Sequence, residues 1–180
     1  RNQKGGAMDR KINIGWILGV AAAATLCTGS TIANDAPTVA EQMAGLQQMC
    51  TETAEARAQR QAQHPLYDRL GGYEKINEMT REVVRLHKEN DDIKEMFEYV
   101  DTERLAKSVA DFTSAGTGGP HEYTGRTMPA VHANLKLTDA DFLSAGGDIV
   151  TAMQTMGYGQ NEIDEFVCIL VSLKDQVVFK

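Results

Sequence analysis

Apolar residues recur at the three- and four-residue spacing of an amphipathic α-helix from Leu66 onward, and no segment alternates as a β-strand would. The clearest stripe lies in residues 73–89, where four apolar residues and one histidine share a helical face: Ile76, Met79, Val83, Val84 and His87. Residues 101–115 repeat the pattern, with Leu105, Val109 and Phe112 on one side. These patterns predict an all-α protein.

Glycine pairs and capping residues divide this helical part into segments. Asp101 is placed to cap a helix that begins at residue 102. Thr138 and Asp141 form a capping box, which predicts a helix running to about Met156. Asn161 is then expected to cap the last helix. Residues 91–97 are expected to be a short connection.

The first 33 residues have the pattern of an export signal. Met8 is followed by charged residues, an uncharged run from Ile12 to Ala33, and a small-x-small cleavage site at 31–33. Residues 1–7 read as sequence upstream of this start. An uncleaved membrane anchor is the alternative, because residues 12–33 are just long enough to cross a bilayer. We therefore expect a periplasmic or secreted protein, or one anchored to the membrane.

Residues 34–65 read as a linker followed by a helical extension. Val39, Met43, Leu46 and Cys50 form one apolar stripe and predict a helix over residues 38–63. Beyond Thr51 this helix has little apolar face, so it is a solvated helix or a spacer. Self-association through residues 38–63 is one role open to it.

Charge and cysteine content narrow the classes of function. A net charge of −7 leaves no basic stripe for a phosphate backbone, so nucleic acid is not an expected partner. The sequence has no CxxC pair, which argues against a zinc or redox module. Cys50 and Cys168 could pair in an oxidising compartment, or Cys168 could be a small buried hydrophobe within "FVCILVSL".

One of the four histidines stands in an unusual local setting. His132 follows the glycine-containing loop "GTGGPHEYTGRT" and lies on a short amphipathic helix between Met128 and Leu135. Taken alone, a histidine among apolar neighbours is more often a hydrogen-bonded core residue than a ligand. The wider pattern around His132 favours the ligand.

The order and spacing of motifs from Leu66 to Met153 resemble group I truncated haemoglobins without a gap. The resemblance is carried by "LYDRLGG" (66–72), Phe97, "DTERL" (101–105), Phe112, "GGP" (118–120), "YTGR" (123–126), Met128 and His132 in "MPAVH", and "LTDADF" (137–142). It implies a two-over-two helical sandwich around one haem b in residues 66–180, preceded by the extra N-terminal helix. Without a CxxCH motif, the haem would be held non-covalently.

The resemblance also assigns the haem contacts. It implies that His132 is the proximal iron ligand, and that the cofactor is bound by Val84, Phe97, Leu105, Val109, Phe112, Tyr123, Arg126, Met128 and Phe142. Relatives commonly carry a tyrosine at the position of Val84 and often a polar residue at that of Val109. Here Val84, Leu105 and Val109 offer no donor, which disfavours oxygen storage and nitric oxide dioxygenation. Dioxygen gains about 1–3 kcal/mol from such a donor.

His87, three residues past Val84 on the same helix, has two readings. It is a half-buried histidine at the end of its helix, or it lies on the distal face as a donor or second iron ligand.

We therefore expect an exported haem protein that binds small gases, with nitric oxide or carbon monoxide favoured over dioxygen. The alternatives are a haem redox enzyme acting on nitric oxide, nitrite or peroxide, which would need an electron-donor protein, and a helical self-association module in which haem is secondary.

Overall fold

The computed structural model describes residues 36–179, and this part of the chain contains helices and no strand. The helices are α1 (Val39–Glu52), α2 (Ala54–Gln63), α3 (Leu66–Arg69), α4 (Gly72–Glu89), the 3₁₀ helix η1 (Lys94–Phe97), α5 (Thr102–Gly116), α6 (Met128–His132), α7 (Asp139–Thr155) and α8 (Gln160–Val177). The all-α prediction is confirmed. The predicted signal or anchor lies in residues 1–33, outside the described residues, and none of the helices in 36–179 is long and apolar enough to cross a membrane.

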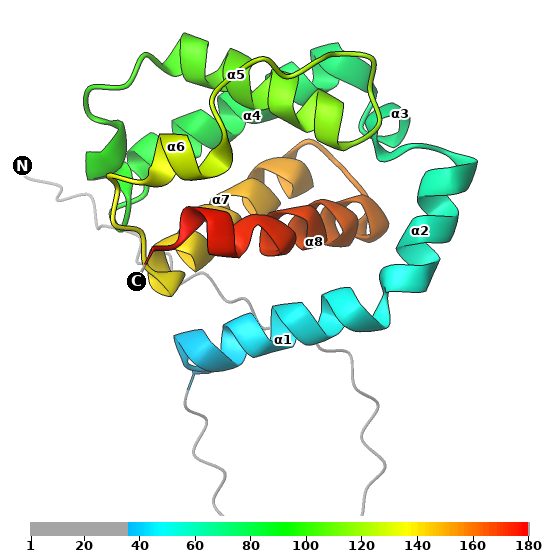
Figure 1. Ribbon diagram of the computed structural model, residues 1–180, viewed down its shortest axis with the longest axis horizontal. Coiled ribbons are helices and arrows are strands. Elements are labelled where there is room, and N and C mark those ends of the chain that lie inside the picture. The colour runs from blue at the N-terminus through cyan, green and yellow to red at the C-terminus, as the bar shows by residue number, and fades with distance from the viewer. Residues whose placement is uncertain (1–35, 180) are drawn as a thin grey trace, which may run out of the picture. The chain divides into compact units, whose positions relative to one another are not determined.

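Two helix pairs form the main body of residues 36–179 (Figure 1). Helix α4 packs along α5, α7 packs along α8, and α4 contacts α7 where the pairs meet. The short helix α3 touches both α4 and α8, and α6 lies against α8. This is the predicted two-over-two arrangement.

The hydrophobic core fills the space between the two pairs. Its buried members come from α3, α4, α5, α7, α8 and the turn after α3: Leu66, Leu70, Ile76, Met79, Val83, Ala110, Ala152, Met153, Ile163 and Phe166. Three of them belong to the apolar stripe predicted for residues 73–89. Burying one large apolar side chain contributes about 1.5–3 kcal/mol, so this cluster holds the pairs together.

The helix caps agree with the sequence at two of three positions. The Arg104 amide donates to Asp101 Oδ1 over 3.1 Å at the start of α5, and Thr138 and Asp141 form the predicted capping box of α7. The expected cap by Asn161 is wrong, because Gly159 is the N-cap of α8. The extended backbone of Gly159 directs its carbonyl into the first turn, where it accepts two amide hydrogen bonds.

The N-terminal extension is two helices instead of the single helix predicted over residues 38–63. The chain changes direction at Thr53, between α1 and α2 (Figure 1). Thr53 Oγ1 donates to the carbonyl of Met49 over 2.8 Å, a type of hydrogen bond that often bends helices. Arg57 Nη2 then donates to the carbonyl of Cys50 over 2.5 Å, and so satisfies an acceptor at the break.

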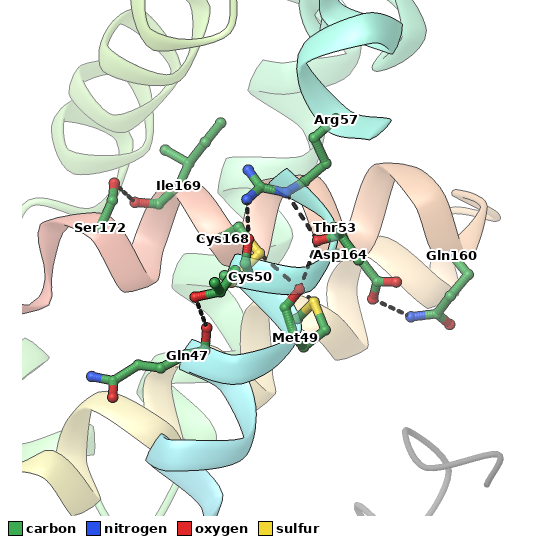
Figure 2. The surroundings of a disulfide bond; sticks show 11 residues. Gln47, Met49, Cys50, Thr53, Arg57, Gln160, Asp164, Cys168, Ile169 and Ser172 are labelled. Carbon is green, nitrogen blue, oxygen red and sulfur yellow. Dashed lines mark hydrogen bonds between the residues drawn. A yellow bond between two sulfur atoms is a disulfide. The ribbon is translucent and has the colours of Figure 1, made fainter. Parts of the chain in front are cut away.

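A disulfide joins the extension to the last helix. Cys50 on α1 and Cys168 on α8 are bonded, with their Cα atoms 5.4 Å apart and a sequence separation of 118 (Figure 2). Cys168 is also buried, so it is both a core residue and a disulfide partner. Helix α1 packs against α7 and α8, where Met43 is buried.

Loss of this disulfide is expected to destabilise the protein. The Cys50→Ser variant should lower the free energy of unfolding by about 2–5 kcal/mol, because the unfolded chain regains the freedom that a long covalent loop removes. Thermal unfolding with and without a reductant measures this. Reductant should bring the wild type to the midpoint of the variant and leave the variant unchanged. A variant as stable as the non-reduced wild type would contradict the expectation.

Candidate functional site

His132 is half-buried at the end of α6, and one ring nitrogen is engaged by the backbone. Its Nδ1 lies 2.8 Å from the carbonyl oxygen of Met128. A carbonyl only accepts, so Nδ1 carries the proton and the neutral imidazole has its lone pair on Nε2. The same bond fixes the orientation of the ring, as in many metal-ligating histidines. In this arrangement Nε2 is the ring nitrogen that could bind a metal.

The aromatic residues predicted to contact the cofactor stand apart from the core. Phe97, Phe112 and Phe142 are only half-buried, and none of them belongs to the core cluster. Leu105 and Val109 on α5 are half-buried in the same way. A large apolar group laid over such side chains would remove their remaining surface from water. An imidazole nitrogen is a common ligand of haem iron, and half-buried aromatic and aliphatic side chains suit the apolar macrocycle.

The loop before α6 connects three of the predicted residues. The rings of Phe112 and Tyr123 meet edge to face with centroids 5.1 Å apart. Tyr123 Oη donates to the carbonyl of Arg126 over 2.8 Å, and the Arg126 guanidinium donates to the carbonyl of Ala130 in α6. The structure therefore links α5 through this loop to the helix that carries His132.

The three predicted distal residues have no side-chain donor. Val84 on α4 is 4% exposed, and Leu105 and Val109 lie on α5. Val84 lines a cavity between α4 and α5 with Arg81, Arg85, Lys88, Thr102, Glu103 and Ala106. Leu105 and Val109 are not in the lining of this cavity. The shared distal role of the three residues stays a prediction.

His87 has an acidic partner that the sequence reasoning missed. Its Nδ1 donates to Asp148 Oδ2 on α7 over 2.8 Å, and its ring lies beside that of Phe97, with centroids 5.2 Å apart. Its role as a distal donor or iron ligand stays a prediction. The signal for Asp148 was the one acid within the otherwise uncharged stretch "AGGDIVTAM".

A second set of polar side chains holds the start of the loop before α6 against α4 and α5. His121 stacks on Tyr73 at 4.1 Å, and its Nδ1 lies 3.0 Å from Ser114 Oγ. Tyr73 Oη and Lys107 Nζ donate to the two oxygens of Asp111, over 2.6 and 2.7 Å. The hydrogen bond from Lys107, and then that from Tyr73, lowers the pKa of Asp111, whereas the bond to Asp111 raises the pKa of Tyr73.

Comparison with known proteins gave a family and several relatives. A family model described as bacterial-like globin matches residues 65–179. The group 1 truncated hemoglobin GlbN of Mycolicibacterium paratuberculosis is 25% identical over 112 residues, which are 62% of this chain and 82% of that protein.

Solved structures show the same fold. The truncated hemoglobin of Tetrahymena pyriformis in its Fe(III) form matches with a TM-score of 0.61 and 19% identity, over 65% of this chain and 100% of that one. The 2/2 hemoglobin of Synechococcus sp. PCC 7002, in the cyanomet state and with covalently attached heme, matches with a TM-score of 0.57 and 25% identity, over 63% and 94% of the two chains.

The loop that leads to α6 is expected to tolerate no side chain at Gly119. A Cβ there would lie 2.4 Å from Tyr67 Cδ2 and 2.5 Å from Ser114 Oγ. Gly119→Ala should therefore shift the loop and lower the free energy of unfolding by about 1–3 kcal/mol.

Gly116→Ala is the matched control, because a Cβ at the last residue of α5 meets nothing within 4 Å. It should be neutral or stabilising, since alanine favours helix. Denaturant unfolding of both variants gives the comparison, and equal stabilities would refute the tight packing of this loop.

Proposed function

Since the chain belongs to the bacterial-like globin family, as a two-over-two truncated globin with haem as its cofactor and diatomic gases as its ligands, we propose that His132 Nε2 is the proximal iron ligand. The observation that supports this is the hydrogen bond from Nδ1 to the carbonyl of Met128, which leaves Nε2 as the free nitrogen. Phe97 would stack on the haem, and Phe112 and Phe142 would form walls of its pocket. When bound, haem supplies an iron atom with a coordination position for a gas.

The pocket residues favour nitric oxide or carbon monoxide over dioxygen. The side chains of Val84, Leu105 and Val109, the predicted distal residues, donate no hydrogen bond. A hydrogen-bond donor stabilises bound dioxygen by about 1–3 kcal/mol. Its absence therefore lowers the affinity for dioxygen by roughly tenfold or more. Carbon monoxide depends on a donor much less, so an apolar pocket retains it with little loss.

The proposal includes a location outside the cytoplasm. The disulfide between Cys50 and Cys168 supports this, because structural disulfides persist in oxidising compartments and are rare in the cytosol. The basic start and uncharged run of residues 8–33 agree with export.

Removal of the His132 imidazole is expected to abolish stable haem retention. The His132→Ala variant should lose the haem spectrum, or recover it only when free imidazole is added. His64→Ala is the control, since His64 is an exposed residue at the end of α2. Absorption spectra of the ferric, ferrous and carbonyl forms give the answer. A His132→Ala variant with an unchanged haem spectrum would rule out ligation by this residue.

A hydroxyl placed on α4 is expected to slow the release of dioxygen. Val84→Tyr should lower the dioxygen dissociation rate by roughly tenfold or more through one charge-assisted hydrogen bond. Carbon monoxide release should change much less. Val84→Phe supplies the bulk without the hydroxyl, so an equal effect of the two variants would mean crowding instead of a hydrogen bond. Laser photolysis and stopped-flow mixing measure both gases.

Export is expected to remove the first 33 residues. The intact mass of protein taken from its native periplasmic or membrane fraction should correspond to a chain that begins near residue 34. A mature chain that still begins at Met8 would favour the membrane anchor.

A further inference from the structure

A polar network with a buried pair at its centre joins the end of α4 to α7. His87 and Asp148 are 9% and 7% exposed, and their side chains meet over 2.8 Å. Asn90 Nδ2 also donates to Asp148 Oδ2, over 2.9 Å, and to Ser144 Oγ, over 2.9 Å. Ser144 Oγ in turn donates to Asp92 Oδ2 over 3.0 Å. We refer to these five residues as the His87 network.

Stability alone is a poor explanation for this network. Burying a carboxylate and an imidazole costs desolvation energy, and apolar residues of similar volume would often stabilise the helices as well or better. His87 also lies on the apolar stripe of α4, where an aliphatic residue would continue the core. Hydrogen bonds to a buried polar pair do, however, favour one arrangement of the elements that they connect.

The network fixes the residues around Phe97. The His87 ring lies against the Phe97 ring, with centroids 5.2 Å apart and planes inclined by 37°. Phe97 ends η1, which packs on α4 just after the turn that contains Asn90 and Asp92. On the other side, Ser144 and Asp148 lie on α7, the helix that also carries Phe142. The network therefore sets the position of Phe97 relative to the helix of Phe142.

We propose that His87 and Asp148 are positioning residues that hold Phe97 against the haem. Asp148 fixes the His87 ring through Nδ1, and the face of that ring supports Phe97. This inference rests on the proposed function, in which haem is bound through His132. It assigns His87 a role through Phe97, in place of a direct contact with the iron or its ligand.

A double-mutant cycle tests the proposal. His87→Leu and Asp148→Ala are made in the wild type and in a Phe97→Leu background, and haem loss to an excess of a haem-accepting apoprotein is timed. Each variant should speed haem loss about fivefold in the wild type. This is the effect expected when one interaction as strong as a typical hydrogen bond is lost. Each should change it less than about twofold when Phe97 is absent, because residues that act through one another are not additive.

Tyr158→Phe is the matched control. It removes a different hydrogen bond between distant segments, from Tyr158 Oη in the turn before α8 to the carbonyl of Leu70, over 2.8 Å. This variant should leave the rate of haem loss unchanged in both backgrounds.

A readout without haem completes the test. The protein has five phenylalanines, so fluorophenylalanine labelling of the apoprotein gives a small set of ¹⁹F signals, and Phe97→Leu identifies that of Phe97. This signal should shift in His87→Leu and Asp148→Ala and stay in place in Tyr158→Phe. An unchanged Phe97 signal would overturn the proposal.

The remaining outcomes separate the competing explanations. Equal acceleration of haem loss by His87→Leu with and without Phe97 would overturn the proposal in favour of a direct role of His87 at the iron. A lowered unfolding midpoint with unchanged haem loss would overturn it in favour of a purely structural network. A wild-type protein that binds no haem would refute the proposed function itself, a result distinct from both.

Discussion

Two pairs of short helices must supply both a protein core and the walls of a cofactor pocket, and the burial of apolar surface has to serve both. The side chains of Ile76, Met79 and Val83 on α4 are buried in contacts between the two helix pairs. Phe112 on α5 and Phe142 on α7 are left half-buried beside that core. Because hydrophobic burial is roughly proportional to area, the side chains kept out of the core are the ones that gain most from a bound apolar group. Folding therefore buries one set of apolar side chains on these helices, and cofactor binding would bury their neighbours.

The loop between α5 and α6 shows how this small frame positions a ligand residue. Gly118 has φ +95°, which turns the chain out of α5, and Gly119 passes close to the ring of Tyr67. The Tyr67 amide donates to the carbonyl of Thr117, and Gln61 of α2 donates to the same carbonyl. The extension, the "LYDRLGG" segment and the loop before His132 are thus joined at one point. A change in any of the three segments would be transmitted to the other two.

The helices and most of their caps could be predicted because their signals are local. The stripe of α4 and the capping box of Thr138 and Asp141 need only neighbouring residues. The break at Thr53 was missed, because alanine, glutamine and glutamate continue the helical pattern on both sides of it. The bend depends on side-chain bonds to the carbonyls of Met49 and Cys50, which periodicity does not register.

The site divides in the same way. His132, Phe112 and Tyr123 were predicted as site residues through a resemblance carried by one contiguous stretch of sequence. The partnership of His87 with Asp148 spans 61 residues and depends on how α4 meets α7. Likewise, the sequence left the pairing of Cys50 and Cys168 open, because their separation in sequence says nothing of their distance in space.

The disulfide also changes the topology of the molecule. Cys50 and Cys168 close a covalent ring over 118 residues of sequence, and every residue assigned to the haem, from Val84 to Phe142, lies inside it. A protease that cuts one exposed peptide bond in the loop between α5 and α6 would therefore produce two segments that stay linked in one molecule. Outside the cell, the predicted haem contacts on either side of such a cut would therefore remain in one covalently linked molecule.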